Sequence, residues 1–266
     1  MTDVIVRGAA GRMGIHLVSL LLRNEKLRLF GAIERKGHPA SGRDAGEFAG
    51  LGKSGIIISE TIPSNLPKET VCIDFSSPES TLGGFRWAEE NRIPLVIGTT
   101  GFNEEQSGRI SALAKKIPVV FSPNMSIGVN LMFKLLKEAA SKLSRDYDME
   151  IVELHHHLKK DAPSGTALKM ARILADSLGE KLENVAVYHR EGMIGERKKK
   201  EIGIQTVRAG DIVGEHTVYF VGPGERLEIT HKASSRENFA QGALVAAGWL
   251  SGKSPGLYDM QAVLGL

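Results

Sequence analysis

The sequence predicts an α/β protein: a doubly wound parallel sheet, followed by a second α+β domain with a mixed open sheet. Over residues 1–125, short apolar runs alternate with helical patterns, which favours parallel strand pairing. A glycine-rich turn joins the first apolar run to the first helical pattern. Within residues 202–231, strand-like stretches follow one another without helices, which favours an antiparallel or mixed sheet.

In the first part of the chain, strands are expected at short apolar runs that end in turn residues: Asp3–Arg7, Leu27–Glu34, Val71–Phe75, Leu95–Ile97 and Val119–Phe121. Helices are expected between them, at Arg12–Asn24, after Ser77 and from about Asn103. Ser77 is a candidate N-cap, because Pro78 suits the first position of a helix.

After residue 126 the pattern changes. Helices are expected at Val129–Leu143, Ser164–Leu178 and Phe239–Leu250, and strands at Tyr147–Leu154, Ile202–Arg208, His216–Val221 and Arg226–His231. Gly179 is the expected stop of the middle helix. We therefore expect residues 1–126 and 237–266 to form a dinucleotide-binding domain, and residues 127–236 to form a second, substrate-binding domain.

Composition excludes several classes of protein. No apolar run reaches the length of a membrane span, and no secretory signal is visible, so a cytoplasmic protein without a membrane partner is expected. The net charge of +3 is too small to indicate nucleic-acid binding, but it is compatible with an acidic small-molecule substrate. The basic run Arg197–Lys200 lies between two glutamates and is expected to be a solvated loop.

The glycine-rich turn indicates a nucleotide site. Gly8, Gly11 and Gly14 allow a tight turn, close backbone approach to a pyrophosphate, and close helix packing. Glu34 follows the second strand, where a carboxylate binds an adenosine ribose, and Arg35 is placed to meet a 2′-phosphate. We therefore predict a Rossmann-like domain that uses both NADH and NADPH. The alternative is a turn that only joins strand and helix.

Two other loops follow expected strands, at residues 98–101 and 122–126. Ligands bind at the carboxyl ends of strands in such sheets, so these loops are candidates to line the nicotinamide and its ribose. Asn124 is a candidate partner for the carboxamide. Both loops are equally compatible with ordinary capped connections between a strand and a helix.

The segment 153–167 concentrates groups suited to proton transfer. His155, His156 and Lys159 offer proton donors and a cation for carboxylates, and a helix that starts at Gly165-Thr166 offers backbone amides to an anion. A metal site is the alternative, because Glu153, His155 and His157 would share one face of a strand. The adjacent lysines oppose a cation, so we expect no metal there and only a packing or solvated role for His157.

Seven segments together resemble the 4-hydroxy-tetrahydrodipicolinate reductase family, also called dihydrodipicolinate reductases. They are GAAGRMG (8–14), Glu34-Arg35, VIGTTGF (96–102), NMSIGVN (124–130), residues 155–167 without His157 and Lys160, VRAGDIVGEH (207–216) and LEITHKASSR (227–236). The resemblance covers essentially the whole chain, and the histidine-to-threonine segment is its most specific part. It implies a cytoplasmic homotetramer of the diaminopimelate route to lysine. This enzyme reduces a cyclic dicarboxylic acid with NADH or NADPH and loses water, and its second domain also serves oligomerisation.

The resemblance also assigns roles to residues. His155 maps onto the proton donor/acceptor and Lys159 onto a second proton donor, while the substrate carboxylates map onto His156, Gly165 and Thr166. The cofactor contacts map onto Gly8, Ala9, Ala10, Gly11, Arg12, Met13, Glu34, Arg35, Gly98, Thr99, Thr100, Ser122, Pro123, Asn124 and Met125. Ser122-Pro123 stands where other members often have small residues such as alanine, a change that main-chain contacts tolerate. Leu158 departs from the polar residue of some members and is given no role.

Two other functions remain open on the residues alone. One is a dehydrogenase for another small acid. The other is a nucleotide-sensing protein, which would keep the glycine turn and Glu34 but would have no use for His155 together with Lys159.

Overall fold

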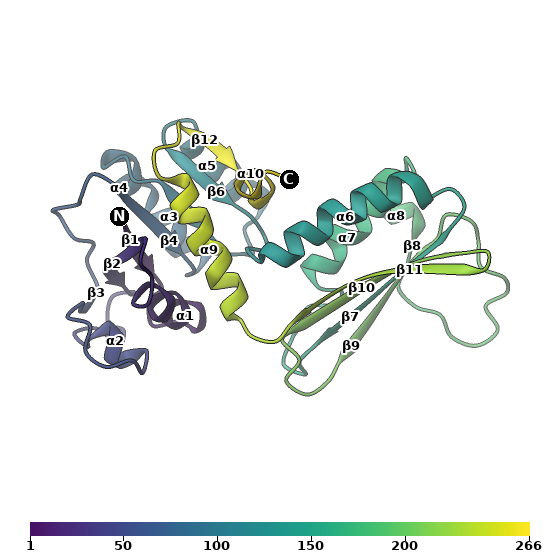
Figure 1. Ribbon diagram of the computed structural model, residues 1–266, viewed down its shortest axis with the longest axis horizontal. Helices are drawn as coiled ribbons and strands as arrows, with labels where there is room; N and C mark the ends of the chain where they lie inside the picture. The colour runs from purple at the N-terminus through teal and green to yellow at the C-terminus, as the bar shows by residue number, and fades with distance from the viewer. The chain divides into compact units, whose positions relative to one another are not determined.

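The computed structural model describes all 266 residues, and these divide into two compact units (Figure 1). One unit comprises Met1–Ile127 with Arg236–Leu266, and the other comprises Gly128–Ser235. No helix is both long enough and apolar enough to cross a membrane.

The first unit is built on a seven-stranded sheet in which every neighbouring pair is parallel. Its order is β12-β6-β5-β4-β1-β2-β3, so the predicted doubly wound sheet is confirmed. The strands are β1 (Thr2–Arg7), β2 (Leu27–Ile33), β3 (Ile58–Ser59), β4 (Thr70–Asp74), β5 (Leu95–Ile97), β6 (Pro118–Phe121) and β12 (Gly256–Tyr258). From β1 the chain continues outward to β2 and β3, and from β4 it continues outward in the opposite direction to β5 and β6. The strand order therefore reverses between β1 and β4, and sheets of this kind bind ligands at the carboxyl ends of the strands at such a reversal.

Helices cover both faces of this sheet because successive strand residues point to opposite sides. Val4 and Val6 of β1 pack into one apolar cluster, whereas Ile5 belongs to the cluster on the other face. The first face carries α1 (Arg12–Leu21), α9 (Glu237–Leu250) and α10 (Met260–Leu264), with α2 (Ala45–Phe48) packed near α1. The second face carries α3 (Pro78–Gly83), α4 (Phe85–Glu90) and α5 (Glu104–Ala114).

Local signals explain where the helices of this unit begin and end. Ser77 caps α3 as predicted, and Asn103 caps α5 in a reciprocal capping box with Gln106. The expected extension of α1 to Asn24 is wrong: α1 ends at Leu21, because the side-chain oxygen of Asn24 accepts the amides of Lys26 and Leu27 and forms a turn there.

The second unit contains the predicted mixed open sheet, in the order β11-β10-β7-β9-β8. β10 is antiparallel to β7 and β11, whereas β9 is parallel to β7 and β8. The strands are β7 (Asp148–His155), β8 (Ala186–Val187), β9 (Ile202–Arg208), β10 (Gly214–Gly222) and β11 (Glu225–Ala233). The helices are α6 (Ile127–Leu143), α7 (Gly165–Ser177) and α8 (Leu182–Val185).

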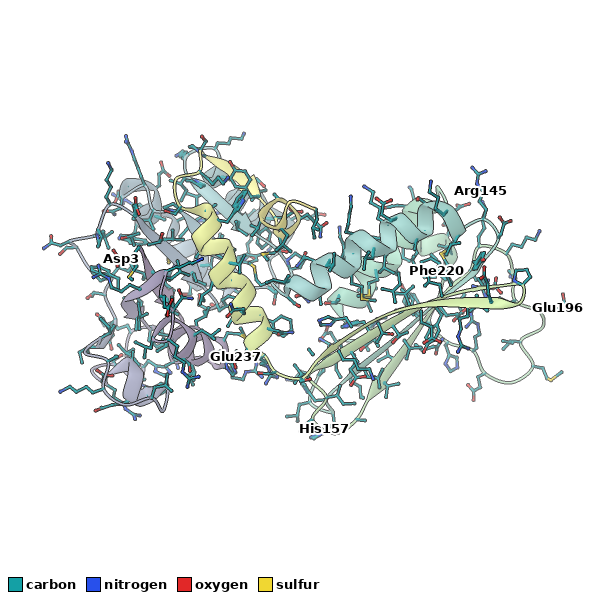
Figure 2. All side chains as sticks on the ribbon, in the orientation of Figure 1. Asp3, Arg145, His157, Glu196, Phe220 and Glu237 are labelled. Carbon is teal, nitrogen blue, oxygen red and sulfur yellow. The ribbon has the colours of Figure 1, made fainter.

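Helices α6 and α7 lie over one face of this sheet. Phe220 of β10 is buried in the apolar layer between these helices and the sheet (Figure 2). Alternate residues of β7 face this layer: first Met149 and Ile151, then Glu153 and His155. The strand therefore carries apolar residues into the core and delivers two polar residues at its carboxyl end.

The basic run Arg197–Lys200 is a loop, but the expectation that it is merely solvated is wrong for Arg197. Its guanidinium pairs with Asp148 at 2.6 Å and with Glu150 at 3.3 Å, and its side chain is only 23% exposed. These carboxylates lie on the neighbouring strand β7, so Arg197 anchors the loop to the sheet.

Candidate functional site

The turn between β1 and α1 is as tight as its glycine spacing predicts. Gly8 has a φ of +75°, and a Cβ atom there would lie 2.7 Å from the carbonyl oxygen of Phe75. At Gly14, a Cβ atom would lie 2.1 Å from the carbonyl oxygen of Gly8. Only glycine therefore lets α1 pack this closely against the turn.

The start of α1 offers backbone donors to an anion. Gly11 is the N-cap residue, and the first intrahelical bond runs from the amide of Ile15 to the oxygen of Gly11 at 3.0 Å. The amides of Arg12, Met13 and Gly14 come before Ile15, so the helix supplies no carbonyl four residues earlier for them to bond. The first turn also contains no acidic residue that would repel an anion. This cradle fits the pyrophosphate of a dinucleotide.

Glu34 is held against this turn. Its carboxylate accepts the amide of Ala10 at 3.1 Å and that of Arg35 at 2.9 Å, while the amides of Gly8 and Ala9 bond to the last residue of β2. A carboxylate has further lone pairs, so Glu34 retains acceptors for ribose hydroxyls. The exposed Arg35 is its immediate neighbour.

A pocket at this end of the sheet is lined by Glu34 and Arg35, and also by residues that the sequence did not single out: Lys36, Glu60 and Ser80. The Glu60 carboxylate accepts the amide of Gly37 at 2.8 Å, and this hydrogen bond holds the carboxylate in place. With Arg7, which also lines the pocket, two carboxylates and three cations surround the place predicted for the adenosine ribose.

A buried ion pair supports the loops beside the turn. Arg7 of β1 lies 2.8 Å from Asp74 of β4, whose side chain is 1% exposed. Asp74 also accepts the amide of Ser76 at 3.0 Å, and the same amide lies 3.0 Å from the hydroxyl of Thr99. The carboxyl ends of β1, β4 and β5 are therefore tied together beneath the ligand-binding edge.

The loop after β5 is shaped by Phe75. A Cβ atom at Gly98 would lie 2.1 Å from the Phe75 ring, so a side chain there would displace the aromatic ring. Thr99 is buried and bonds to neighbouring loops, whereas Thr100 is exposed. Within this predicted segment, Thr100 is therefore the hydroxyl that remains open to a ligand.

The loop after β6 has a mixed character. Ser122 and Met125 are buried, and Pro123 is exposed. The Ser122 hydroxyl donates to the carbonyl of Asn124 at 3.0 Å, and the Asn124 side-chain oxygen accepts the amide of Ser126 at 2.8 Å. Asn124 therefore uses its side-chain oxygen to shape the turn, and this loop presents mainly its backbone.

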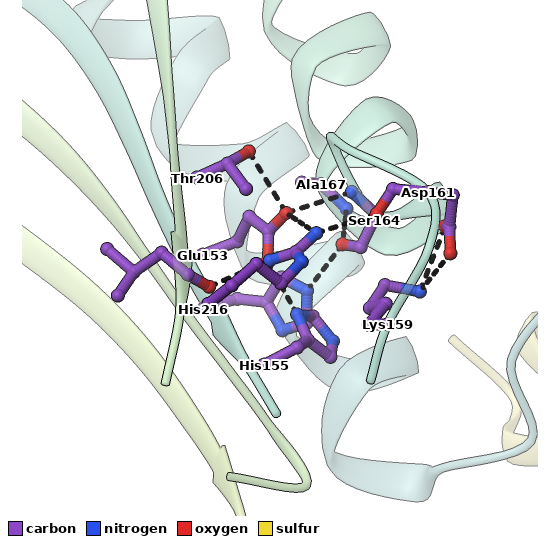
Figure 3. Close-up of polar contacts among 10 residues, drawn as sticks. Glu153, His155, Lys159, Asp161, Ser164, Ala167, Thr206 and His216 are labelled. Carbon is purple, nitrogen blue, oxygen red and sulfur yellow. Dashed lines mark hydrogen bonds and ion pairs between the residues drawn. The ribbon is translucent and has the colours of Figure 1, made fainter. Parts of the chain in front are cut away.

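In the second unit, Glu153 is the centre of a buried network (Figure 3). His155 Nδ1 lies 2.5 Å from Glu153 Oε2, and Arg208 places one guanidinium nitrogen 2.9 Å from each carboxylate oxygen. Glu153 Oε1 also accepts the amide of Ser164 at 3.0 Å and the hydroxyl of Thr206 at 3.1 Å. The Glu153 carboxylate thereby links the end of β7, the residue before α7, and β9.

Strand register produces this arrangement. Parallel pairing of β7 with β9 sets Arg208 opposite His155, and antiparallel pairing with β10 sets His216 opposite Glu153. The predicted alternative in which His157 shares the strand face of His155 is wrong, because β7 ends at His155. His157 Nδ1 instead lies 2.8 Å from the carbonyl of Gly210, and its side chain is exposed.

The network and its burial shift the pKa values of Glu153 and His216. Burial alone would raise the pKa of Glu153, but hydrogen bonds from His155, Arg208 and the Ser164 amide outweigh it and lower that pKa to about 2. Burial, with a smaller contribution from the neighbouring His155, lowers the pKa of His216 to about 3. Near neutral pH, Glu153 is therefore a carboxylate and His216 a neutral imidazole.

Lys159 lies in the loop between β7 and α7. Its Nζ contacts the two carboxylate oxygens of Asp161 at 2.8 and 2.9 Å, and its side chain is 21% exposed. Arg208 donates to the Asp161 carbonyl at 2.7 Å, which joins this loop to the Glu153 network. The amide of His156, at the start of the loop, donates to the carbonyl of Ile212 at 2.7 Å.

Ser164 caps α7 as the sequence predicts. Its hydroxyl accepts the amide of Ala167 at 3.1 Å and lies 3.0 Å from His216 Nε2. Gly165 is exposed, and a Cβ atom there would meet no atom within 4 Å. The start of α7, with Gly165 followed by Thr166, is therefore open to an approaching anion.

Sequence reasoning singled out the histidines, Lys159 and the helix start, but it treated Glu153 only as a possible metal ligand. It did not identify Asp161, Arg208 or His216 as members of the site. The only signal in the sequence was their occurrence in the segments that resemble the family, because their contacts depend on strand register.

Comparisons with known proteins agree over the whole chain. The family model described as "Dihydrodipicolinate reductase, N-terminus" matches residues 2–125, and that described as "Dihydrodipicolinate reductase, C-terminus" matches residues 128–264. The chain is 54% identical to a 4-hydroxy-tetrahydrodipicolinate reductase of Syntrophus aciditrophicus, over 100% of this chain and 99% of the relative. It is 55% identical to that of Syntrophotalea carbinolica, with 100% of both chains covered.

Among solved structures, the fold is similar to a dipicolinate-bound dihydrodipicolinate reductase from Paenisporosarcina sp. TG-14. The TM-score is 0.69 at 24% identity, and 97% of each chain is covered. At this identity the likeness concerns the fold.

Proposed function

The chain belongs to the dihydrodipicolinate reductase family, and from this premise we propose how its own residues carry the family's reaction. It is an NAD(P)H-dependent oxidoreductase that reduces 4-hydroxy-tetrahydrodipicolinate to tetrahydrodipicolinate with loss of water, in the diaminopimelate route of lysine biosynthesis. One observation supports the proposed roles most directly. A single buried network holds His155, the loop that carries Lys159, and the start of α7.

In the proposed cofactor site, the amides of Arg12 and Met13 at the start of α1 bind the pyrophosphate, and Glu34 accepts hydrogen bonds from the adenosine ribose. Arg35 pairs with the 2′-phosphate of NADPH. The other contacts come from the glycine turn and the two strand-end loops, Gly8 to Gly11, Gly98 to Thr100 and Ser122 to Met125. When bound, the nicotinamide supplies the hydride.

In the proposed substrate site, two carboxylates of a dianion are neutralised by His156, Lys159 and the helix start at Gly165 and Thr166. A helix N-terminus offers donors and positive potential to an anion, and an ammonium adds a full charge. Either His155 or Lys159 then provides the proton that the ring nitrogen takes up as electron density moves onto it. These groups hold the substrate in place and supply a proton at a defined atom.

Mixing the purified protein with NADPH or NADH and freshly formed product of dihydrodipicolinate synthase tests this assignment. Rapid loss of reduced-nicotinamide absorbance is expected. Oxidation only with simple hydroxy acids or aldehydes would favour another dehydrogenase. Cofactor binding without oxidation in the presence of the dicarboxylate would favour a nucleotide sensor.

The roles of the chain segments form part of the proposal. Residues 1–126 with 237–266 bind the cofactor, and residues 127–236 bind the substrate and form the contacts of a homotetramer in the cytoplasm. Val207 and Val221 support an interface role, because they are 38% and 39% exposed on the sheet face opposite α6 and α7. Sedimentation velocity should give the mass of four chains, and Val221→Glu should reduce that mass.

A further inference from the structure

We propose that Glu153 is the positioning residue of the substrate site: it determines which ring nitrogen of His155 carries the proton, and it holds the start of α7 beside that ring. The inference rests on the proposed role of His155 as proton donor/acceptor. It concerns the tautomer of that histidine, which is measurable without any reaction.

The ionised Glu153 fixes the direction of the hydrogen bond between the two side chains. Glu153 is fully buried and ionised, so both its oxygens can only accept hydrogen bonds. His155 Nδ1, 2.5 Å from Oε2, must therefore be the donor. In the neutral ring this places the lone pair on Nε2, which becomes the nitrogen that exchanges protons with a ligand.

The space around that nitrogen depends on a glycine of β10. Gly214 is the first residue of β10 and precedes Glu215, which pairs with Leu154 of β7. A Cβ atom built on Gly214 would lie 3.0 Å from His155 Nε2. Any other residue at this position would therefore crowd the nitrogen. The glycine leaves space beside Nε2 that a side chain would fill.

A guanidinium balances the charge of the Glu153 carboxylate. Arg208 pairs with both oxygens of Glu153, which fixes the plane of the carboxylate and offsets its charge. Charged and titratable groups also face His155 from β10, where the His216 ring lies 5.2 Å away in an edge-to-face arrangement. His231 of β11 is paired with His216 in the sheet register.

Glu153 also contacts the segment that leads into the proposed anion site. Glu153 Oε1 accepts the amide of Ser164, the residue that caps α7 and precedes Gly165. The carboxylate that orients His155 thus also sets the position of the helix start that is proposed to bind the substrate carboxylate. If the ion pair of Glu153 with Arg208 served only to stabilise the fold, Glu153 would not need to contact both the His155 ring and the Ser164 amide.

The strand itself offers a matched control. Glu150, also on β7, pairs with both terminal nitrogens of Arg190, at 2.9 Å to each carboxylate oxygen, and none of its contacts is with a histidine. Glu150→Gln therefore removes the charge from a comparable glutamate–arginine pair in the same strand. Any general effect of weakening such a pair should appear in both variants.

The direct test is the tautomer of His155, read from long-range proton–nitrogen NMR spectra of the full-length protein with nitrogen-labelled histidine. The His155 signal is identified by its loss in His155→Asn. At a pH at which the ring is neutral, we expect its proton on Nδ1 and an unprotonated Nε2 in the wild-type protein and in Glu150→Gln. A neutral ring protonated on Nε2 in the wild-type protein would overturn the proposal, whatever the enzyme's activity.

The kinetic test compares Glu153→Gln with Glu150→Gln. A glutamine amide can donate to Nδ1 and so favour the opposite tautomer. We expect kcat to fall about 100-fold or more, with the KM for NADPH little changed and a distorted pH profile of kcat. Glu150→Gln should stay within about twofold of wild type, a margin smaller than any loss of a catalytic contact.

Glu153→Asp keeps a carboxylate and should recover part of the lost kcat, which also covers the case in which Glu153→Gln does not fold. A folded Glu153→Gln that matches Glu150→Gln in kcat and in tautomer would refute the inference. If the wild-type protein fails to reduce the dicarboxylate, the proposed function fails, while the NMR result still decides whether Glu153 sets the tautomer.

Discussion

Replacing His216 with glutamine should make the folded protein less sensitive to acid. The imidazole is almost fully buried on β10, and its Nε2 lies 3.0 Å from the hydroxyl of Ser164. Burial, with a smaller contribution from the neighbouring His155, lowers its pKa to about 3, whereas the unfolded chain has the ordinary histidine value of 6.5. Below pH 6.5 the unfolded chain therefore takes up a proton that the folded chain does not, so stability falls as the pH falls.

The size of this effect follows from the two pKa values. At about pH 5, protonation of one such histidine stabilises the unfolded chain by RT ln(1 + 10^1.5), or about 2 kcal/mol, and the effect is nearly absent at about pH 7.5. Glutamine does not take up a proton, so the variant lacks this contribution to the free energy of unfolding. Its free energy of unfolding should therefore change by about 2 kcal/mol less than that of wild type between these two pH values.

Urea unfolding followed by far-UV circular dichroism at both pH values measures this difference. Tryptophan fluorescence would miss it, because Trp87 and Trp249 both lie outside residues 128–235. Packing lost in the variant affects both pH values alike and cancels in the comparison. His189→Gln is the matched control, since its side chain is 77% exposed. If His216→Gln loses as much stability on acidification as wild type, the assignment of this buried neutral imidazole is wrong.

Three further changes test the proposed sites. Lys159→Ala should lower kcat/KM by about 30- to 1000-fold, or roughly 2–4 kcal/mol of transition-state stabilisation, measured by NADPH oxidation. Arg35→Ala should raise the KM for NADPH more than that for NADH, because a guanidinium pairs with a 2′-phosphate. Gly14→Ala should weaken NADPH binding by about tenfold or more in a calorimetric titration, since the new Cβ atom would lie 2.1 Å from the carbonyl oxygen of Gly8.

Each change has a control or a contrary outcome. Lys160→Ala removes the exposed neighbouring lysine and should leave turnover near wild type, and a Lys159 variant that behaves like it would contradict the proton-donor role. Equal losses for both cofactors would show that Arg35 does not recognise the 2′-phosphate. Gly83→Ala adds a Cβ atom where no atom lies within 4 Å, so it should bind NADPH normally.

Elements specified by local patterns were predicted well from the sequence. Leu95–Ile97 and Ile202–Arg208 are strands over the predicted ranges, and Ser77 and Ser164 cap helices as predicted. Very short elements were missed, such as α2 and β3, because a strand of two residues or one helical turn has no measurable period.

Other features depend on contacts between distant residues. Arg7 and Asp74 lie next to each other only because β1 pairs with β4, and Glu60 lines the pocket proposed for the cofactor only because β3 joins the edge of the sheet. Nothing in the local sequence around either residue indicates its partner.

By itself, the sequence determined the two kinds of sheet, the glycine turn, and the segment that carries His155 and Lys159, because period, capping and turn chemistry act over a few neighbouring residues. Only the tertiary structure decided that Glu153 bonds to His155 and to Arg208, which is 55 residues away. Strand register makes that choice, since a shift of one residue would turn each side chain to the opposite face of the sheet.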